Sequence, residues 1–463
     1  MNHHRNPNVD DNLIEALRGI VGERLSLGLS VREQHSQDLS FHYGDPADVV
    51  VFAQSTEEVS GIVKICAARK VPVVPYGAGT SLEGHLAALE GGVSIDLSGM
   101  DKIIAINQGD MDATVQAGVT RKQLNQHLHN TGLFFPIDPG ADASLGGMVA
   151  TRASGTNAVR YGTMRESVMA LTVVKADGSI IKTGTRARKS SAGYDLTRLF
   201  VGSEGTLGIV TEITVRLHGI PEFMLSAVVS FPAIEPAVNT VIQTMQMGIP
   251  IARIEFIDDV QMAAINSYSN LDYPEQPTLF LEFSGTEAAV REQIELVEGL
   301  CDDNGGGDFR WAEKQEDRNA LWQARHDAAY AAMALRPGGK PWFTDVCVPI
   351  SNLAECILET RKDIDDSALI APIVGHVGDG NFHLGLLVNP DDAEELAAAE
   401  HINRRMIMRA IGMGGTCSGE HGIGYGKKEF MEAEHGEALE TMRDIKRALD
   451  PDNIMNPGKV FDL

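Results

Sequence analysis

The stretch Val74-Pro75-Tyr76-Gly77-Ala78-Gly79-Thr80-Ser81-Leu82-Glu83-Gly84 places a glycine-rich loop directly after a short run of strand-forming residues. A glycine loop that follows a strand can turn its backbone N–H groups toward a phosphate group. The loop does not match the dinucleotide-binding fingerprint, because Leu82 stands where the third glycine is required. A plain tight turn therefore stays the alternative to a phosphate-binding loop.

Hydrophobic periodicity around this loop alternates between helix and strand. The apolar positions within 56–70 recur on one face, as in an amphipathic helix. The Asp177-Gly178 pair between two β-rich runs is a strong hairpin signal. Strands and helices at this spacing predict an α/β or α+β domain. The expected strands in this half are 49–53, 71–75, 93–97, 170–176, 179–183 and 209–217.

Pro221 marks the expected boundary to a second domain, and 463 residues are enough for two or three domains. The strands expected there are 227–231, 278–283 and 382–388. The expected helices are 237–247, 286–304, 318–334, 353–366, 393–413 and 442–449. We therefore expect an N-terminal helical segment over 1–45, a first domain over 46–221, a second over 222–414 and a C-terminal segment over 415–463.

The composition narrows the classes of partner. The formal net charge of -25 disfavours nucleic acid, because phosphate binding needs clustered Lys and Arg. The five cysteines are scattered without a CxxC pair, so we expect neither a disulfide framework nor a zinc ribbon, and a reducing compartment fits. No apolar signal region stands near the start, and no run of about 18 apolar residues occurs. These features predict a cytoplasmic protein, and peripheral attachment to the inner membrane stays open.

Two stretches in the C-terminal third combine histidine, carboxylate and glycine. In Gly375-His376-Val377-Gly378-Asp379-Gly380-Asn381-Phe382-His383, two histidines stand seven residues apart, with His383 near the start of the expected strand 382–388 and His376 in the loop before it. The stretch Gly419-Glu420-His421-Gly422 adds a carboxylate and a third histidine. Neutral imidazole and carboxylate suit a divalent ion such as Zn²⁺ or Mn²⁺. From spacing alone the bland readings stay open: loop histidines bonded to the backbone, a capping Glu420 and a surface His421.

Three separated segments resemble the flavin-contacting segments of the FAD-binding family typified by vanillyl-alcohol oxidase and p-cresol methylhydroxylase. They are the loop at 74–84 and the stretches 138–147 and 202–210, in that order. The resemblance implies an α+β fold, with a two-subdomain FAD-binding domain and an α+β substrate (cap) domain. The branch resembled here binds FAD non-covalently, so His85 is expected to be an ordinary neighbour. The implied FAD contacts are Pro75, Gly77, Ala78, Gly79, Thr80, Ser81, Gly84, Pro139, Gly140, Ser144, Gly147, Gly205, Gly208, Ile209 and Asn456.

Later stretches narrow the resemblance. The segments 344–351, 375–383, 415–424 and 449–459 are similar to those of FAD-linked D-lactate dehydrogenases of the cytochrome type. The resemblance covers nearly the whole chain after residue 45, and it implies that the C-terminal segment returns to the flavin site. It also implies metal binding by His376, His383 and Glu420, a catalytic base at His421 and a place at the substrate for Asn381.

These implied roles describe one reaction, the oxidation of a small-molecule 2-hydroxy acid. The metal binds the substrate and lowers the pKa of its hydroxyl group, as it does for a bound water. His421 accepts the hydroxyl proton, and the hydrogen on Cα leaves as hydride to flavin N5. Arg325 matches the substrate arginine of the family by its position in a helix, and we expect it to clamp the carboxylate. Without the resemblance, a surface helix arginine is an equal alternative.

The resemblance extends to enzymes with different substrates. The D-2-hydroxyglutarate dehydrogenase branch has a lysine where this chain has Phe343, two residues before Asp345. The missing cation favours a monocarboxylic substrate. A glycolate oxidase flavin subunit, which works with partner subunits, is a second candidate, and a non-catalytic flavin- or metal-binding module is a third. The electron acceptor is left open among a quinone, a cytochrome and an electron-transfer flavoprotein, as is a homodimer.

Overall fold

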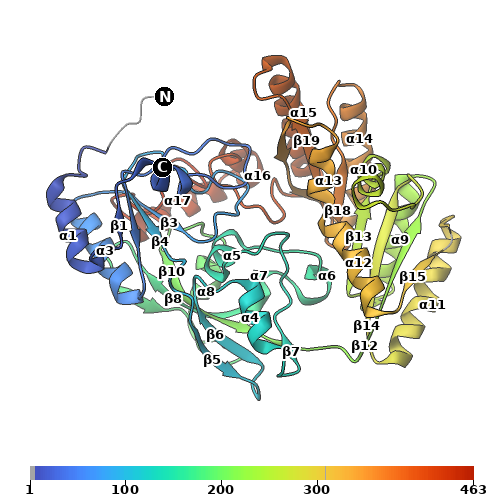
Figure 1. Cartoon of the computed structure of the whole chain (residues 1–463), viewed down its shortest axis with the longest axis horizontal. Helices are drawn as coiled ribbons and strands as arrows, with labels where there is room; N and C mark the ends of the chain where they lie inside the picture. The colour runs from blue at the N-terminus through green and yellow to red at the C-terminus, as the bar shows by residue number, and fades with distance from the viewer. Residues whose placement is uncertain (1–5, 308) are drawn as a thin grey trace. The chain divides into compact units, whose positions relative to one another are not determined.

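The computed structural model describes residues 6–307 and 309–463, and the chain divides into two compact units (Figure 1). The first unit comprises Met1–Ser154, Tyr161–Ile220 and Glu420–Leu463. The second comprises Gly155–Arg160 and Pro221–Gly419. The chain thus enters most of its second unit at Pro221 and leaves it after Gly419.

The first unit begins with a small, mainly parallel sheet of order β1-β2-β4-β3. Its strands are β1 (Leu25–Ser26), β2 (Val49–Phe52), β3 (Val73–Tyr76) and β4 (Val93–Asp96). Strands β2 and β4 are buried along nearly their whole length, as expected for parallel strands covered on both faces. The helices α1 (Asp11–Val21) and α3 (Thr56–Ala68) lie side by side next to this sheet (Figure 1).

A second sheet of the same unit is antiparallel, with the order β5-β6-β10-β8-β9. Its strands are β5 (Ile103–Asn107), β6 (Asp112–Gln116), β8 (Val168–Val174), β9 (Ile180–Lys182) and β10 (Ile209–Arg216). Helix α3 also packs against β8 and β10. One apolar core therefore runs through both sheets and includes Ile62, Val173 and Ile213.

Short elements complete the first unit. They are α2 (Leu29–Gln34), α4 (Arg121–Leu128), β7 (Leu133–Phe134), α5 (Leu145–Thr151), α7 (Met164–Ser167), α8 (Leu196–Phe200), β11 (His218–Gly219), η3 (Lys428–Phe430), α16 (Met431–His435) and α17 (Ala438–Leu449). Helix α6 (Ala158–Tyr161) lies where the chain briefly changes unit.

The second unit is built on one large sheet of order β15-β12-β14-β13-β18-β19-β16, and β17 also pairs with β19. Neighbouring strands are antiparallel. The interior strand β14 is buried along nearly its whole length, so both faces of the sheet are covered there. The strands are β12 (Phe223–Ser230), β13 (Arg253–Ile257), β14 (Thr278–Gly285), β15 (Arg310–Ala312), β16 (Lys340–Phe343), β17 (Val346–Cys347), β18 (Ile373–His376) and β19 (Asn381–Val388).

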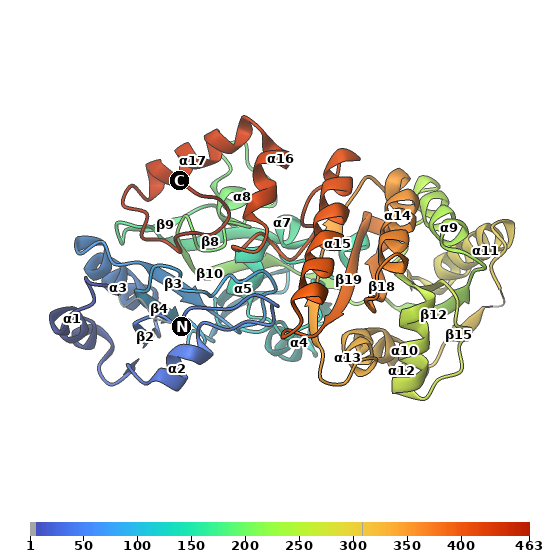
Figure 2. The ribbon, with the colours of Figure 1, turned by 90° about the horizontal axis from the view of Figure 1, so that it is seen from above.

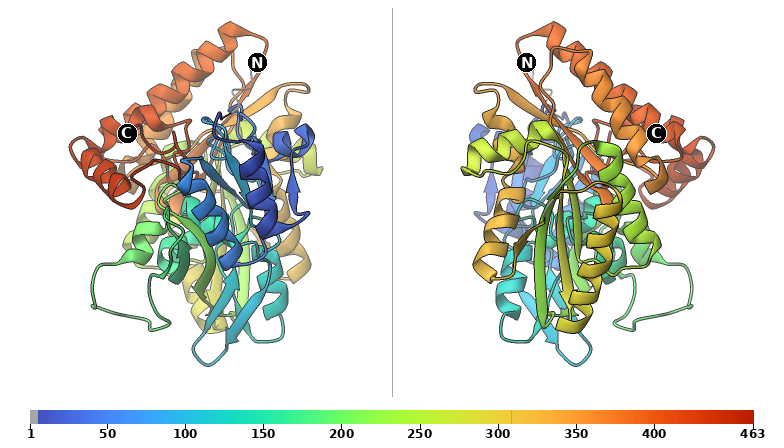
Figure 3. Two further views of the ribbon diagram at one scale, coloured as in Figure 1. Left: turned by 90° about the vertical axis from the view of Figure 1, so that its left-hand side faces the viewer. Right: turned by 90° about the vertical axis from the view of Figure 1, so that its right-hand side faces the viewer.

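Two groups of helices cover this sheet. The helices α10 (Asp259–Ser269), α12 (Gln315–His326) and α13 (Ala328–Ala334) share an apolar cluster with Phe280 of β14. The second group is α9 (Ile234–Gln246), α11 (Glu287–Asp303), α14 (Leu353–Asp365) and α15 (Ala393–Gly412), and within it α14 and α15 run side by side (Figures 2 and 3). The short helices are η1 (Ile350–Asn352) and η2 (Val377–Asp379).

One predicted helix is wrong in its length. The expected helix 318–334 is divided into α12 and α13 at Asp327. The carboxylate of Asp327 accepts a hydrogen bond from Gln323 Nε2 at 2.8 Å. The backbone of Asp327, with φ of -76° and ψ of -1°, departs from helical geometry where α12 ends and α13 begins. No helix of the described residues is both long and apolar enough to cross a membrane.

Candidate functional site

The glycine loop at 77–84 follows the carboxyl end of β3 and is closely packed. A side chain at Gly77 would overlap the hydroxyl group of Ser144, and one at Gly84 would overlap the ring of Tyr425. Gly84 also has a φ of +71°, which glycine adopts at little cost. The loop is therefore restricted to glycine for reasons of space as well as backbone conformation.

The structure brings the three predicted flavin segments together in the first unit. Ser144 caps α5 and faces Gly77, while Gly205 packs against Pro75 of β3. The Nδ2 of Asn456 donates to the backbone oxygen of Glu204 at 2.8 Å, and its backbone N–H donates to the oxygen of Val73 at 2.8 Å. Of the remaining predicted residues, Gly208 and Ile209 pack in the core at the start of β10. Ala78, Gly79, Thr80, Ser81, Pro139, Gly140 and Gly147 lie in the same loops and at the start of α5.

Glu204, which the sequence analysis missed, connects the third flavin segment to the loop that carries His421. Its carboxylate accepts hydrogen bonds from the backbone N–H groups of Ile423 at 2.7 Å and Gly424 at 2.8 Å. It also lies 3.1 Å from Nε2 of His85. Burial would raise the pKa of Glu204, but His85 and the two N–H groups outweigh burial and lower it. His85 is thus a buried partner of Glu204.

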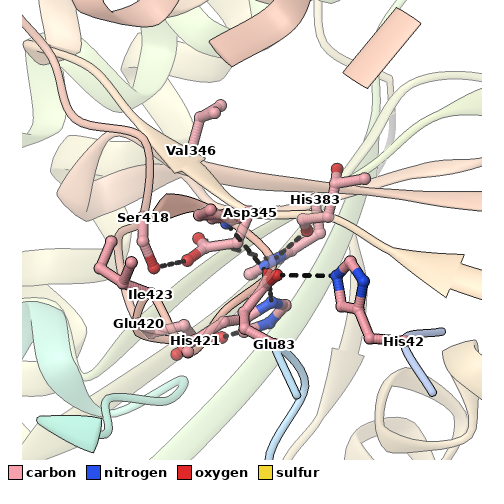
Figure 4. Close-up of polar contacts among 12 residues, drawn as sticks. His42, Glu83, Asp345, Val346, His383, Ser418, Glu420, His421 and Ile423 are labelled. Carbon is pink, nitrogen blue, oxygen red and sulfur yellow. Dashed lines mark hydrogen bonds and ion pairs between the residues drawn. The ribbon is translucent and has the colours of Figure 1, made fainter. Parts of the chain in front are cut away.

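His421 lies in a buried charged network. Its side chain is 9% exposed, so it is not the surface histidine that spacing alone allowed. Its Nδ1 lies 3.7 Å from Oε1 of Glu83, and His42 Nε2 lies 3.5 Å from the same carboxylate (Figure 4). Nζ of Lys427 lies 3.2 Å from Oε1 of Glu83. Burial would raise the pKa of Glu83, but Lys427 and the two histidines outweigh it and hold the pKa at about 2. A buried negative charge therefore lies beside the His421 imidazole. Glu420 is also half-buried, and its Oε1 lies 4.0 Å from Nε2 of His421.

In the second unit, His376 and His383 are neighbours on adjacent strands. His376 ends β18, so its predicted place in a loop is wrong. His383 belongs to β19 as predicted, and the register pairs Gly375 with Phe382. The two imidazole centroids are 5.3 Å apart with the rings nearly perpendicular. Gly380 has a φ of +79° in the turn between the strands, where a side chain would overlap the backbone oxygen of Val348.

Hydrogen bonds fix which nitrogen of each histidine carries the proton. Nδ1 of His376 lies 2.8 and 2.9 Å from the two carboxylate oxygens of Glu255. Nδ1 of His383 lies 3.1 Å from the backbone oxygen of Thr344. Because carboxylate and carbonyl oxygens only accept, each neutral imidazole carries its proton on Nδ1 and its lone pair on Nε2. This is the tautomer that a metal ligand needs, so the donor set fits a divalent metal.

Arg325 is buried, which excludes a surface helix arginine. It is 8% exposed on α12, and its Nη2 donates to Oε2 of Glu255 at 2.6 Å. Its Nε is buried without a hydrogen-bond partner in the described part of the chain. Burial would raise the pKa of Glu255, but His376 and Arg325 outweigh it and lower the pKa. One side of the guanidinium group is therefore occupied inside the protein, and the Nε–H remains for a further acceptor.

Asn381 and Ser418 share a buried carboxylate. Asp345 accepts from Nδ2 of Asn381 at 2.6 Å. It also accepts from Oγ of Ser418 at 2.7 Å (Figure 4). Asn381 is 5% exposed, and a side chain at Gly419 would overlap its amide nitrogen. Ser418 precedes Glu420 by two residues, so Asp345 fixes the chain just before the predicted metal ligand.

The residues that the sequence analysis missed are buried carboxylates: Glu83, Glu204, Glu255 and Asp345. Glu255 carried a usable signal, because a charged residue between the apolar residues Ile254 and Phe256 of a buried strand must find a partner inside the protein. The others lie in loops, where a charged residue is ordinary.

Comparisons with known proteins show which family the chain belongs to. Residues 47–184 match the family model described as "FAD binding domain", and residues 220–460 match "FAD linked oxidases, C-terminal domain". The chain is 54% identical to the "Probable D-lactate dehydrogenase, mitochondrial" of Danio rerio, over 98% of this chain and 92% of the relative. It is 48% identical to "D-lactate dehydrogenase [cytochrome], mitochondrial" of Arabidopsis thaliana, over 98% of this chain and 80% of that relative. The fold is similar to the solved structure of p-cresol methylhydroxylase with substrate bound, with a TM-score of 0.80 and 17% sequence identity. The match covers 97% of this chain and 96% of that one.

These comparisons confirm the predicted α+β fold of the vanillyl-alcohol oxidase and p-cresol methylhydroxylase type. They also correct one prediction. The expected cytoplasmic location is wrong, because both named relatives are mitochondrial proteins. Scattered cysteines indicate a reducing environment but not which compartment provides it.

Proposed function

Because the chain belongs to the FAD-linked oxidase family typified by vanillyl-alcohol oxidase and p-cresol methylhydroxylase, we propose that it is an FAD-dependent dehydrogenase that oxidises D-2-hydroxy acids to 2-oxo acids. D-Lactate is the proposed main substrate. The identity to named D-lactate dehydrogenases over nearly the whole chain carries this proposal. A cytochrome is the proposed electron acceptor, as the name of one relative states for that protein.

The flavin is proposed to lie along the segments gathered around Gly77, Ser144, Gly205 and Asn456. When bound, FAD supplies the acceptor for the hydride that leaves Cα of the substrate. The close packing of these segments in the first unit supports a shared cofactor site. The FAD is proposed to be held non-covalently, because His85 is already paired with Glu204.

A divalent metal, Zn²⁺ or Mn²⁺, is proposed to be held by His376, His383 and Glu420. The tautomers of the two histidines support this assignment, since each directs a lone pair from Nε2. The cation would polarise the hydroxyl group of the substrate and favour loss of its proton.

His421 is proposed to accept that proton. The buried negative charge of Glu83 supports this role, because it stabilises the imidazolium ion that results. Arg325 is proposed to bind the substrate carboxylate through its remaining N–H donors. Asn381, which Asp345 holds in place, is proposed to contact the substrate.

A substrate panel tests the proposal. The purified chain should reduce an artificial electron acceptor with D-lactate and not with L-lactate. Faster turnover of D-2-hydroxyglutarate would favour that branch, although Phe343 lies where that branch has its lysine. Activity with glycolate only after partner subunits are added would identify a glycolate oxidase subunit. No turnover and no flavin reduction by any 2-hydroxy acid would leave a non-catalytic binding module and reject the proposal.

A further inference from the structure

The buried carboxylate of Glu255 connects two residues that the proposed function uses for different tasks. We propose that Glu255 is a positioning residue, which fixes His376 as an Nε2 ligand for the metal and holds Arg325 beside it. This inference rests on the proposed function, because it assumes that His376 binds a metal.

The sheet itself places Glu255 against His376. Strand β13 pairs with β18 in antiparallel register, with Phe256 opposite Gly375 and Ile257 opposite Val374. The next position of this register sets Glu255 opposite His376. Glu255 is 1% exposed, and both of its oxygens lie within 2.9 Å of Nδ1 of His376. The backbone pairing and the side-chain contacts therefore agree on one fixed arrangement.

The contact between Glu255 and Nδ1 of His376 affects Nε2, the nitrogen on the opposite side of the imidazole ring. A carboxylate that accepts the Nδ1 proton keeps the lone pair on Nε2, fixes the plane of the imidazole and makes Nε2 a stronger donor to a metal. Arg325 supplies the positive charge that a buried carboxylate requires. Because Arg325 and His376 share Glu255, the same carboxylate sets the position of the proposed substrate clamp.

A purely structural role is the competing explanation, and the neighbouring strand offers a matched control. Glu282 of β14 is 3% exposed. It lies 3.6 Å from Nε of Arg253 and accepts from Oγ of Ser226 at 3.2 Å. Glu282 is thus a second buried carboxylate next to an arginine in the same sheet, and none of these contacts involves His376.

Metal binding is the measurement that separates the two roles. The full-length flavoprotein is stripped with a chelator and titrated with Zn²⁺ against a fluorescent competitor, and its flavin absorbance is checked. Glu255→Gln should raise the Kd for Zn²⁺ about 10- to 100-fold, and Glu282→Gln should change it less than about threefold. Unchanged affinity in Glu255→Gln, or an equal loss in both variants, would overturn the inference while the proposed function stands. No Zn²⁺ binding by the wild-type protein would overturn the metal assignment and this inference together.

A second measurement needs no change at Glu255 and applies if Glu255→Gln fails to fold. Nitrogen-15 NMR of the histidine side chains in the Zn²⁺-loaded wild-type protein reports the tautomer of each ring. The signal of His376 is identified by its loss in His376→Gln. A proton on Nδ1 supports the inference, and a proton on Nε2 overturns it.

Discussion

Replacing Glu204 by glutamine should loosen the loop that carries His421. The carboxylate accepts two backbone N–H bonds, at 2.7 Å from Ile423 and 2.8 Å from Gly424. Glutamine keeps one acceptor oxygen and turns an NH₂ donor toward the other N–H group. The variant therefore loses one bond to a charged group and leaves a buried N–H unsatisfied, which costs about 3 kcal/mol in total. It also removes the negative charge beside His85.

Hydrogen exchange measured by mass spectrometry reports the loss of these backbone hydrogen bonds in the loop itself. Since 1.4 kcal/mol corresponds to a tenfold change, a peptide spanning 420–427 should exchange about 100-fold faster at Ile423 and Gly424. Turnover should fall as well, because His421 precedes the anchored residues by two positions. The matched control is Glu212→Gln. In the wild type, the carboxylate of Glu212 accepts a hydrogen bond from the hydroxyl group of Thr172 on β8, in the same unit. Unchanged exchange of the 420–427 peptide in Glu204→Gln would refute the reasoning, as would an equal effect of Glu212→Gln.

Four further outcomes are expected. His421→Ala should keep the yellow flavin and lose turnover by about 10²- to 10⁴-fold; full activity would reject the base assignment. Dialysis against a chelator should remove activity without bleaching the protein, and Zn²⁺ or Mn²⁺ should restore it, so unchanged activity would contradict a metal requirement. Gly424→Ala should lower the free energy of unfolding in urea by more than about 2 kcal/mol, because the alanine side chain would overlap the backbone of Glu83. Gly414→Ala, also at positive φ but in open space, should lower it by only about 1 kcal/mol. Equal losses in the two variants would contradict the role given to the overlap. Burial would lower the pKa of His35, but the hydrogen bond to the buried Asp96 outweighs burial and raises the pKa above 6.5. The stability that this pair contributes should therefore be full below pH 6.5 and be lost as the pH rises through the folded-state pKa of His35. A His35→Gln variant whose stability has the same pH slope as that of the wild type would contradict the assignment.

Local sequence signals predicted the parts of the fold whose cause is local. The Asp177-Gly178 turn between β8 and β9 and the glycine loop after β3 were predicted from their own residues. The strand that begins near His383 was predicted from the apolar run 382–388. These features were predictable because turn geometry and strand register are set within a few residues.

The missed features depend on residues that are distant in the chain. Glu255 meets His376 across 121 positions, and Glu204 meets Ile423 across 219. No spacing rule connects such pairs, because they meet only through the order of strands in a sheet or the return of the C-terminal segment. Arg325 illustrates the same limit: its place on a helix was predicted, but its buried bond to Glu255 was not.

The most direct test of the central claim is the anaerobic titration of the purified yellow protein with the two enantiomers of lactate. The flavin absorbance should bleach on addition of D-lactate and stay unchanged with L-lactate at the same concentration. Absorbance that persists with D-lactate and every other D-2-hydroxy acid, in protein shown to contain both FAD and metal, would contradict the proposed dehydrogenase.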